Sequence, residues 1–419
     1  MQGENPCLQT ENRPDTIERR PARLPFVVYV LALGTFLMLT TEFVVAGILP
    51  QIAGDLQVPV AEAGLLITVF AAGMVGAPLM AMLTRRLPRR LTLILALVVF
   101  AAGHVVVALG STTGVLLPAR FLTALATGSF WAVAAVVATR AAGEGASSRA
   151  LGIVNAGGML ATVIGVPLGA FAAQVTSWRG TFWALAILAV GAMALIARHV
   201  PRDGAAHRPV SIGSELTVLR SGRLWLALAA CSTTTGGVLA AYSYIAPLLT
   251  DQAGMPSGLV PLVLAGFGVG SLAGSLVGGR LGDSHPHATT ILAPGATAII
   301  LAGICFAADA PIPLTALIVL LGLVGLGANP VLVALAVRYA EHAPTLGSAL
   351  AVAAFNAGTA AASWIGGIAL ASGLGATGPV AVGTAVATLT LIPTIVLALL
   401  HRRATATAAE PVAAAAAAA

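Results

Sequence analysis

The 419-residue sequence contains no lysine and little charge of any kind. Only 9% of its residues are charged, whereas soluble domains carry about 25%, so most of this chain cannot form a water-exposed surface. A chain without lysine cannot carry the Walker sequence G-x-x-x-x-G-K-[ST], which argues against direct drive by ATP. The three cysteines, Cys7, Cys231 and Cys305, are far apart and have no metal or disulfide spacing. We therefore expect neither a cofactor nor a metal.

Hydrophobic residues make up 58% of the chain. Apolar runs long enough to cross a hydrocarbon core of about 30 Å recur from end to end. The sequence predicts an all-α integral membrane protein with twelve transmembrane helices in two six-helix bundles. The expected spans are residues 26–49, 60–84, 91–110, 114–138, 150–173, 181–199, 224–249, 259–281, 289–308, 312–337, 346–371 and 377–400.

The positive charge is distributed unevenly between the two sides of these spans. All 21 basic residues are arginines, and nearly all fall in segments that share one side. Only Arg179 lies in an opposite loop, and only Arg120 lies within a span. Because cytoplasmic loops are rich in arginine, both termini are predicted to be cytoplasmic in a multi-pass protein of the cell membrane. The net charge of +6 then reflects orientation and not nucleic-acid binding.

The two halves of the chain repeat one another. Pro50 aligns with Pro247, Arg140 with Arg338, and the triplet at Asn155 with that at Asn356, all at a nearly constant offset. Such repeats are typical of secondary transporters. The expected organisation is a disordered cytoplasmic tail (1–25), an N-terminal bundle (26–199), a cytoplasmic linker (200–222), a C-terminal bundle (223–400) and a second cytoplasmic tail (401–419).

One acid, Glu42, interrupts the first apolar run, and ionisable residues in membranes are costly unless they function. Arg120 in the fourth span has a matching depth, about 10 Å from the boundary opposite the arginine-rich side. We predict that the two pair, and that a proton and a substrate compete for the carboxyl. The alternative is a static ion pair that only orders the helices.

Other residues carry weaker signals. His104 is expected at a similar depth, as a proton relay or as a packed histidine. Asn155 and Asn356 either bond neighbouring helices or contact the ligand. The aromatic residues are expected to line a substrate cavity, to pack helices or to lie in an interfacial belt. They are Phe130, Trp131, Tyr242, Tyr244 and Trp364.

The loop after the second span resembles that of the major facilitator superfamily, which typically reads G-x-L-small-D-R-x-G-R-R. Residues 81–90 read A-M-L-T-R-R-L-P-R-R, so that Leu83, Arg86, Arg89 and Arg90 fit. A second copy, G-R-L-G-D, ends at Asp283. The resemblance implies that Arg86, Arg89, Arg90 and Asp283 serve a cytoplasmic gate. The first copy lacks the acid, so the gate would depend more on Asp283.

Three further motifs resemble the twelve-helix drug:proton antiporter branch, and within it actinobacterial chloramphenicol efflux proteins. They are T-T-E-F-V-V-A-G-I-L-P at residues 40–50, the arginine of R-F-L-T-A-L-A-T-G at Arg120, and G-V-P-L-G at 165–169. The last varies the antiporter motif G-P-x-x-G. The resemblance implies that Gly165, Pro167 and Gly169 seal the cavity against ion leak, whereas the plain alternative is a helix kink.

The sequence thus predicts a monomeric proton-coupled antiporter that exports a small amphipathic drug, with chloramphenicol as the first candidate, by alternating access. Its partners would be the drug, protons and the lipid bilayer, with no nucleic acid. Efflux of sugars or nucleosides by the same fold is the nearest alternative. An enzyme is disfavoured because the spans hold no nucleophile with a base and no paired catalytic acids. A channel is disfavoured because no selectivity loop or charged ring repeats.

Overall fold

The structure, a computed structural model, describes residues 24–84, 87–143, 146–201, 217–340 and 343–403. This part of the chain is helical and contains no strand. The predicted tails lie almost wholly outside the described residues, as does most of the predicted linker. The all-helical class expected from the apolar runs is confirmed.

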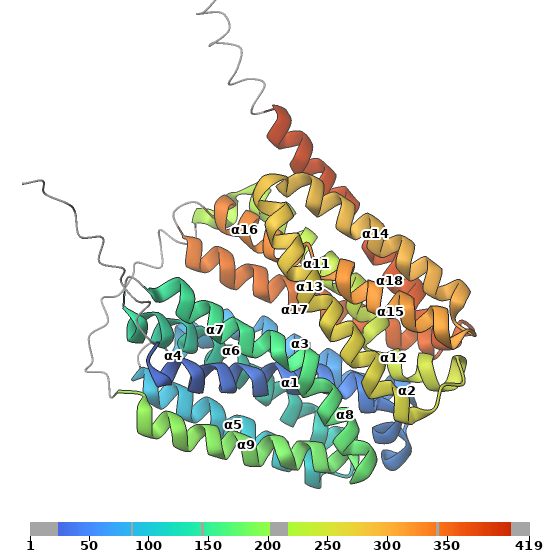
Figure 1. The fold of residues 1–419 in the computed structure, drawn as a ribbon, viewed down its shortest axis with the longest axis horizontal. Coiled ribbons are helices and arrows are strands. Elements are labelled where there is room, and N and C mark those ends of the chain that lie inside the picture. The colour runs from blue at the N-terminus through green and yellow to red at the C-terminus, as the bar shows by residue number, and fades with distance from the viewer. Residues whose placement is uncertain (1–23, 85–86, 144–145, 202–216, 341–342, 404–419) are drawn as a thin grey trace, which may run out of the picture.

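The first half of the chain folds into one bundle, which Figure 1 shows in blue to green. Its elements are α1 (Phe26–Leu56), α2 (Val60–Ala63), α3 (Leu65–Val75), α4 (Ala77–Thr84), α5 (Arg89–Leu109), α6 (Thr113–Ala142), α7 (Ser147–Leu160), the π-turn η2 (Ala161–Gly165), α8 (Val166–Val175) and α9 (Trp178–His199).

The second half forms a second bundle, yellow to red in Figure 1. Its elements are η3 (Thr217–Arg220), α11 (Gly222–Tyr242), α12 (Ile245–Pro247), η4 (Leu248–Gln252), η5 (Ser257–Leu259), α13 (Val260–Ser284), α14 (Pro286–Ala307), α15 (Pro311–Gly325), α16 (Asn329–Tyr339), α17 (Pro344–Leu370), η6 (Gly375–Thr377) and α18 (Gly378–Leu389).

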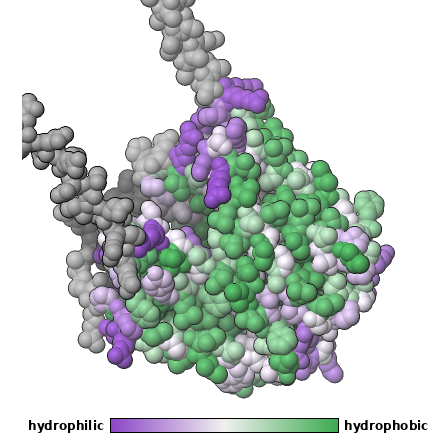
Figure 2. Space-filling model, viewed as in Figure 1, coloured by the Kyte–Doolittle hydropathy of each residue, from purple (hydrophilic) through white to green (hydrophobic). Residues whose placement is uncertain are grey.

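Among the described residues, 11 helices are long and apolar enough to cross a membrane. The segment Val60–Val75 with Ala77–Thr84, bent by 45°, makes a twelfth when it is counted as one span. The first helix continues past Pro50 to Leu56, beyond the predicted end of its span. Hydrophobic residues cover the middle of the face shown in Figure 2, and hydrophilic residues gather towards its margins, as a bilayer requires.

The two ends of the molecule differ in how the bundles pack. At one end, which we call the arginine-rich end, helices begin or finish near Arg89, Arg140, Arg198, Arg280 and Arg338. There the hydrophobic cores are separate, one within each bundle. At the other end a single core runs through both bundles, and we call this the closed end. The bundles therefore meet at the closed end and are not joined by a shared core at the arginine-rich end.

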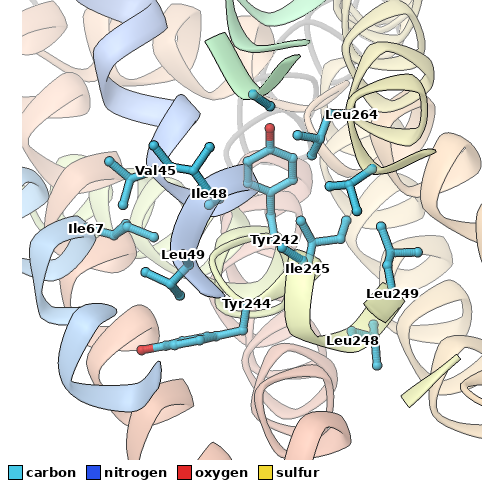
Figure 3. Close-up of a cluster of buried hydrophobic side chains, with 14 of the residues drawn as sticks. Val45, Ile48, Leu49, Ile67, Tyr242, Tyr244, Ile245, Leu248, Leu249 and Leu264 are labelled. Carbon is cyan, nitrogen blue, oxygen red and sulfur yellow. The ribbon is translucent and has the colours of Figure 1, made fainter. Parts of the chain in front are cut away.

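Figure 3 shows part of this shared core. Val45, Ile48, Leu49 and Ile67 from the first bundle face Tyr242, Ile245, Leu248, Leu249 and Leu264 from the second. Among the described residues, one hydrogen bond crosses the bundles here, from Nε2 of Gln174 to the carbonyl of Ser257 at 2.6 Å. Hydrophobic contact thus supplies most of the closure.

Tyr244 extends furthest across this contact. Its hydroxyl donates to the carbonyl of Ser363 on α17 at 3.0 Å, and its ring occupies the space beside Gly64 of the first bundle. Any side chain at Gly64 would collide with this ring. In Figure 3 the Tyr244 ring points towards the light-blue ribbon of the first bundle. Tyr244 therefore fills the closed end and does not face a central cavity.

Replacing Tyr244 by alanine is expected to loosen the closed end. Removing a buried aromatic ring from this contact should cost about 2 kcal/mol, or roughly thirtyfold in the balance between closed and open forms. The measurement is the rate at which a thiol reagent labels a cysteine placed at Ala63, a fully buried small residue of the shared core. Tyr244→Phe keeps the ring and should label slowly. Equal labelling in the alanine and phenylalanine variants would contradict this role.

Each bundle also carries a polar cluster of its own at the closed end. In the first, Asp55 of α1 accepts hydrogen bonds from the indole of Trp178 and the guanidinium of Arg179, which also donates to the carbonyl of Gly110. In the second, Gln252 donates to Asp309 at 2.5 Å. These bonds tie helix ends within a bundle.

Candidate functional site

Glu42 lies on α1 and faces a narrow cavity between the bundles. Its side chain is half-buried, and the cavity is small, with a volume of about 10 Å³. The lining comes from α1 and α3 of the first bundle and from α11 and α17 of the second. The lining residues are Glu42, Phe43, Ala46, Ile67, Phe70, Ala71, Leu239, Tyr242, Ser243 and Thr359. The only carboxyl in this lining is therefore placed where both bundles can act on it.

The walls of this cavity are largely apolar and aromatic. Tyr242 packs edge to face against Phe43 across the bundle boundary, with ring centroids 5.9 Å apart, and lies 4.5 Å from the ring of Phe267. Tyr242, Ser243 and Thr359 are the polar residues that the second bundle contributes to this lining. An apolar pocket with a few polar anchors is the usual form of a small-molecule site.

Arg120 lies behind this cavity, inside the first bundle. It is 1% exposed and comes from α6. Its Nη1 donates to the hydroxyl of Thr41 at 2.8 Å, and its Nη2 donates to the carbonyl of Thr41 at 3.0 Å. Its Cζ lies 4.3 Å from the centroid of the Phe70 ring. A buried guanidinium is thus satisfied by neutral oxygens and an aromatic face.

The direct ion pair that we predicted between Glu42 and Arg120 is not present in the described structure. The two residues lie on adjacent helices and act on one another electrostatically, but the guanidinium bonds to Thr41 instead. The reason is the direction in which each side chain leaves α1. Thr41 and Glu42 point about 100° apart around α1, and Arg120 lies on the Thr41 side.

His104 completes a chain of hydrogen bonds behind Arg120. Its Nε2 lies 2.7 Å from the hydroxyl of Thr41, and its Nδ1 lies 2.6 Å from the carbonyl of Phe100. The imidazole is 1% exposed and packs between Phe100 and Phe182. His104 is therefore a packed histidine, the second of the two predicted roles. It contacts Thr41, the residue next to Glu42.

The structure brings only one of the predicted cavity aromatics to Glu42, namely Tyr242. Phe130 is fully buried within the first bundle beside Gly34. Trp131 is half-buried against Gly158, and Trp364 is 54% exposed on the surface. These residues and Tyr244 do not line this cavity, because their helices turn them towards the bundle interior, the closed end or the outer surface.

The two predicted asparagines do not bridge helices. Asn356 is buried, and its Nδ2 donates to the carbonyl of Val352 one turn earlier on α17. Asn155 on α7 is exposed. Neither lines the cavity of Glu42.

The glycines of the predicted antiporter motif let α1 come close to the fifth span. A side chain at Gly165 would meet Thr40, and one at Gly169 would meet Val44. Pro167 follows the π-turn η2, which interrupts the regular helix before the proline. Because proline has no N–H to donate, the preceding turn is free to widen in this way. The motif thus combines close packing with an irregular turn.

The predicted gate residues are separated. Arg86 lies outside the described residues, Arg89 is buried at the start of α5, and Arg90 donates to the carbonyl of Ala197 in its own bundle. Asp283 lies on α13 in the other bundle, beside a cavity of about 270 Å³ that Arg338 also lines. Among the described residues, Asp283 and Arg90 therefore lie in different bundles and have different neighbours.

Several functional candidates were not distinguishable in the sequence. Phe43, Phe70 and Thr359 line the cavity, but apolar helices give no period that separates them from packing residues. Thr41 could have been proposed as a functional residue from the sequence, because it directly precedes Glu42. As for metals, the described residues contain no group of three His, Cys, Asp or Glu side chains that could hold one.

Two repeated bundles of membrane-spanning helices, with a carboxyl in a cavity between them, define a secondary transporter. Residues 31–310 match the description Major Facilitator Superfamily. The chain belongs to that superfamily.

Related proteins and structures agree with this assignment. The chain is 35% identical to the chloramphenicol resistance protein of Streptomyces lividans, over 85% of this chain and 92% of that protein. It is 32% identical to the inner membrane transport protein YdhP of Escherichia coli strain K12, over 88% of this chain and 95% of that protein. The inward-facing, unoccupied structure of a bacterial homologue of the human lysosomal transporter Spinster shares the fold. Its TM-score is 0.67 at 14% identity, with 89% of this chain and 95% of that chain covered.

Proposed function

We propose that this transporter is a proton-coupled antiporter that exports a small amphipathic drug, with chloramphenicol as the first candidate. The observation that carries the proposal is the Glu42 carboxyl, which faces the cavity between the bundles with Arg120 behind it. The similarity to the chloramphenicol resistance protein of Streptomyces lividans supports the choice of drug. The aromatic walls at Phe43 and Tyr242 suit a ligand with a flat ring.

The arginine-rich end is proposed to face the cytoplasm, by the positive-inside rule. With that orientation, the shared core closes the outer end of the present form. A drug would have to widen the narrow cavity beside Glu42 as it enters. A drug entering from the cytoplasm would occupy the cavity and displace the proton from Glu42. After the bundles rock, a proton arriving from outside would neutralise the carboxyl and release the drug. The two ligands use one group in turn, and this exchange defines antiport.

The test is accumulation of chloramphenicol in intact cells, with a nucleoside panel for comparison. Expressing cells should hold less chloramphenicol than empty-vector cells, and a protonophore should abolish the difference. Arg120→Ala should raise accumulation to the empty-vector level, because it leaves the Thr41 oxygens without their donor. Arg220→Ala, an exposed arginine in η3, is the matched control and should behave as wild type.

The possible results separate the parts of the proposal. Export that persists with the protonophore would overturn proton coupling. Export of nucleosides without chloramphenicol would overturn the drug assignment and leave the transporter class intact.

A further inference from the structure

The guanidinium of Arg120 is held by α1, but not by the acid on that helix. Two of its nitrogens donate to Thr41, one to the side chain and one to the main chain. Its Nε also points to the carbonyl of Leu66 on α3, at 3.5 Å. This arrangement keeps a charged group buried without a carboxylate partner, which is costly unless every acceptor is in place.

The direction of each hydrogen bond in this chain can be derived. The carbonyl of Phe100 can only accept, so Nδ1 of His104 carries the proton and Nε2 accepts. The hydroxyl of Thr41 then donates to Nε2, and its lone pairs are free for Nη1 of Arg120. A neutral His104 therefore orients the Thr41 hydroxyl so that its oxygen faces the guanidinium.

Glu42 is the next residue on α1, and its half-buried side chain faces the cavity. The guanidinium thus bonds to the oxygens of Thr41 and also interacts electrostatically with the carboxyl of Glu42. While Thr41 holds it, the carboxyl is free for a proton or a ligand. When the carboxyl is ionised, a bidentate pair with Arg120 becomes the stronger bond.

We propose that Thr41 and His104 are positioning residues that hold Arg120 beside Glu42 and so set how tightly proton release is coupled to drug binding. This inference rests on the proposed antiport. Neither residue touches the cavity, and both act through Arg120. The other titratable groups near these hydrogen bonds are Glu42 of α1 and Tyr242 of α11, while α3 contributes none.

The test uses the full-length protein in liposomes with chloramphenicol as the probe. Two rates are measured, namely exchange of labelled for unlabelled drug at equal pH on both sides, and accumulation driven by a pH difference. Thr41→Val keeps the shape but removes the hydroxyl, so Arg120 moves to Glu42. Drug exchange should stay within about twofold of wild type, whereas proton-driven accumulation should fall about tenfold, the usual effect of losing a bond to a charged group. The pH of half-maximal accumulation should move towards acid.

Two further variants make the result specific. Thr41→Ser retains the hydroxyl and should restore wild-type accumulation. His104→Phe retains the ring packing against Phe100 and Phe182 but offers no acceptor, so it should shift accumulation in the same direction as Thr41→Val.

Each outcome decides the inference. Unchanged accumulation and pH profile in Thr41→Val, with a coupled wild type, would overturn the positioning role alone. Equal loss of exchange and accumulation would also overturn it, because that pattern indicates damage to binding or folding. A wild-type protein that exchanges chloramphenicol but ignores the pH difference would instead refute the antiport, and this inference with it.

Discussion

Glu42→Gln should abolish proton-driven accumulation of drug, reducing it about 100-fold or to the level of empty liposomes, because an amide cannot exchange a proton at this position. The substitution keeps the size of the side chain, so the cavity that it lines should survive. An amide resembles the neutral carboxyl that releases the drug, so exchange of labelled for unlabelled chloramphenicol at equal pH should weaken as well. The measurement is the same pair of rates in liposomes, with and without a pH difference.

The matched control is Glu62→Gln. Glu62 lies on α2 at the closed end, where its carboxylate accepts a hydrogen bond from Thr113 at 2.9 Å, and an amide oxygen can accept the same bond. This variant should accumulate drug as wild type does. Proton-driven accumulation by Glu42→Gln would refute the role assigned to that residue, because another group would then carry the proton.

Gly268→Val should cause the second large loss. Gly268 on α13 lies directly against the π-turn of the other bundle, and a side chain there would meet the carbonyl of Thr162 and the backbone of Val163. Since neither is the movable end of a side chain, the bundles must separate. We expect drug efflux to fall at least about tenfold, with an interface cost of about 1 to 3 kcal/mol from overpacking. Efflux from cells and thermal stability of the purified protein measure the two effects.

Gly191→Val controls for the loss of glycine itself. Gly191 lies exposed on α9, and a side chain there meets nothing within 4 Å. Efflux by this variant should match wild type. Wild-type efflux by Gly268→Val would show that close approach at this seam is not required for transport.

The fold was predictable because membrane insertion leaves a strong record in composition. Twelve apolar runs, a one-sided distribution of arginine and an internal repeat need no knowledge of packing. The boundaries differ where a helix outlasts its span, as α1 does beyond Pro50. The lipid bilayer determines the class of fold, whereas the ends of the helices depend on local contacts.

The candidate site was predictable only in part. Glu42 and Arg120 were identified because a charge in lipid is rare. Their partners were not, because bond direction depends on helix rotation, and apolar helices leave that rotation unmarked. The prediction that the aromatic residues line the cavity was mostly wrong for the same reason. Of the five candidates, only Tyr242 lines the cavity with Glu42, while Trp364 faces outwards.

The closed end has a thermodynamic character of its own. Its polar clusters at Asp55 and Gln252 lie within single bundles, and among the described residues the bond that crosses between the bundles there, from Gln174 to Ser257, is uncharged. Separating the bundles at the closed end therefore exposes apolar side chains to water and breaks no ion pair among the described residues. Hydration of apolar surface carries a large heat capacity but little dependence on ionic strength. The equilibrium between this form and the form in which the closed end is open should therefore depend on temperature more than on salt concentration.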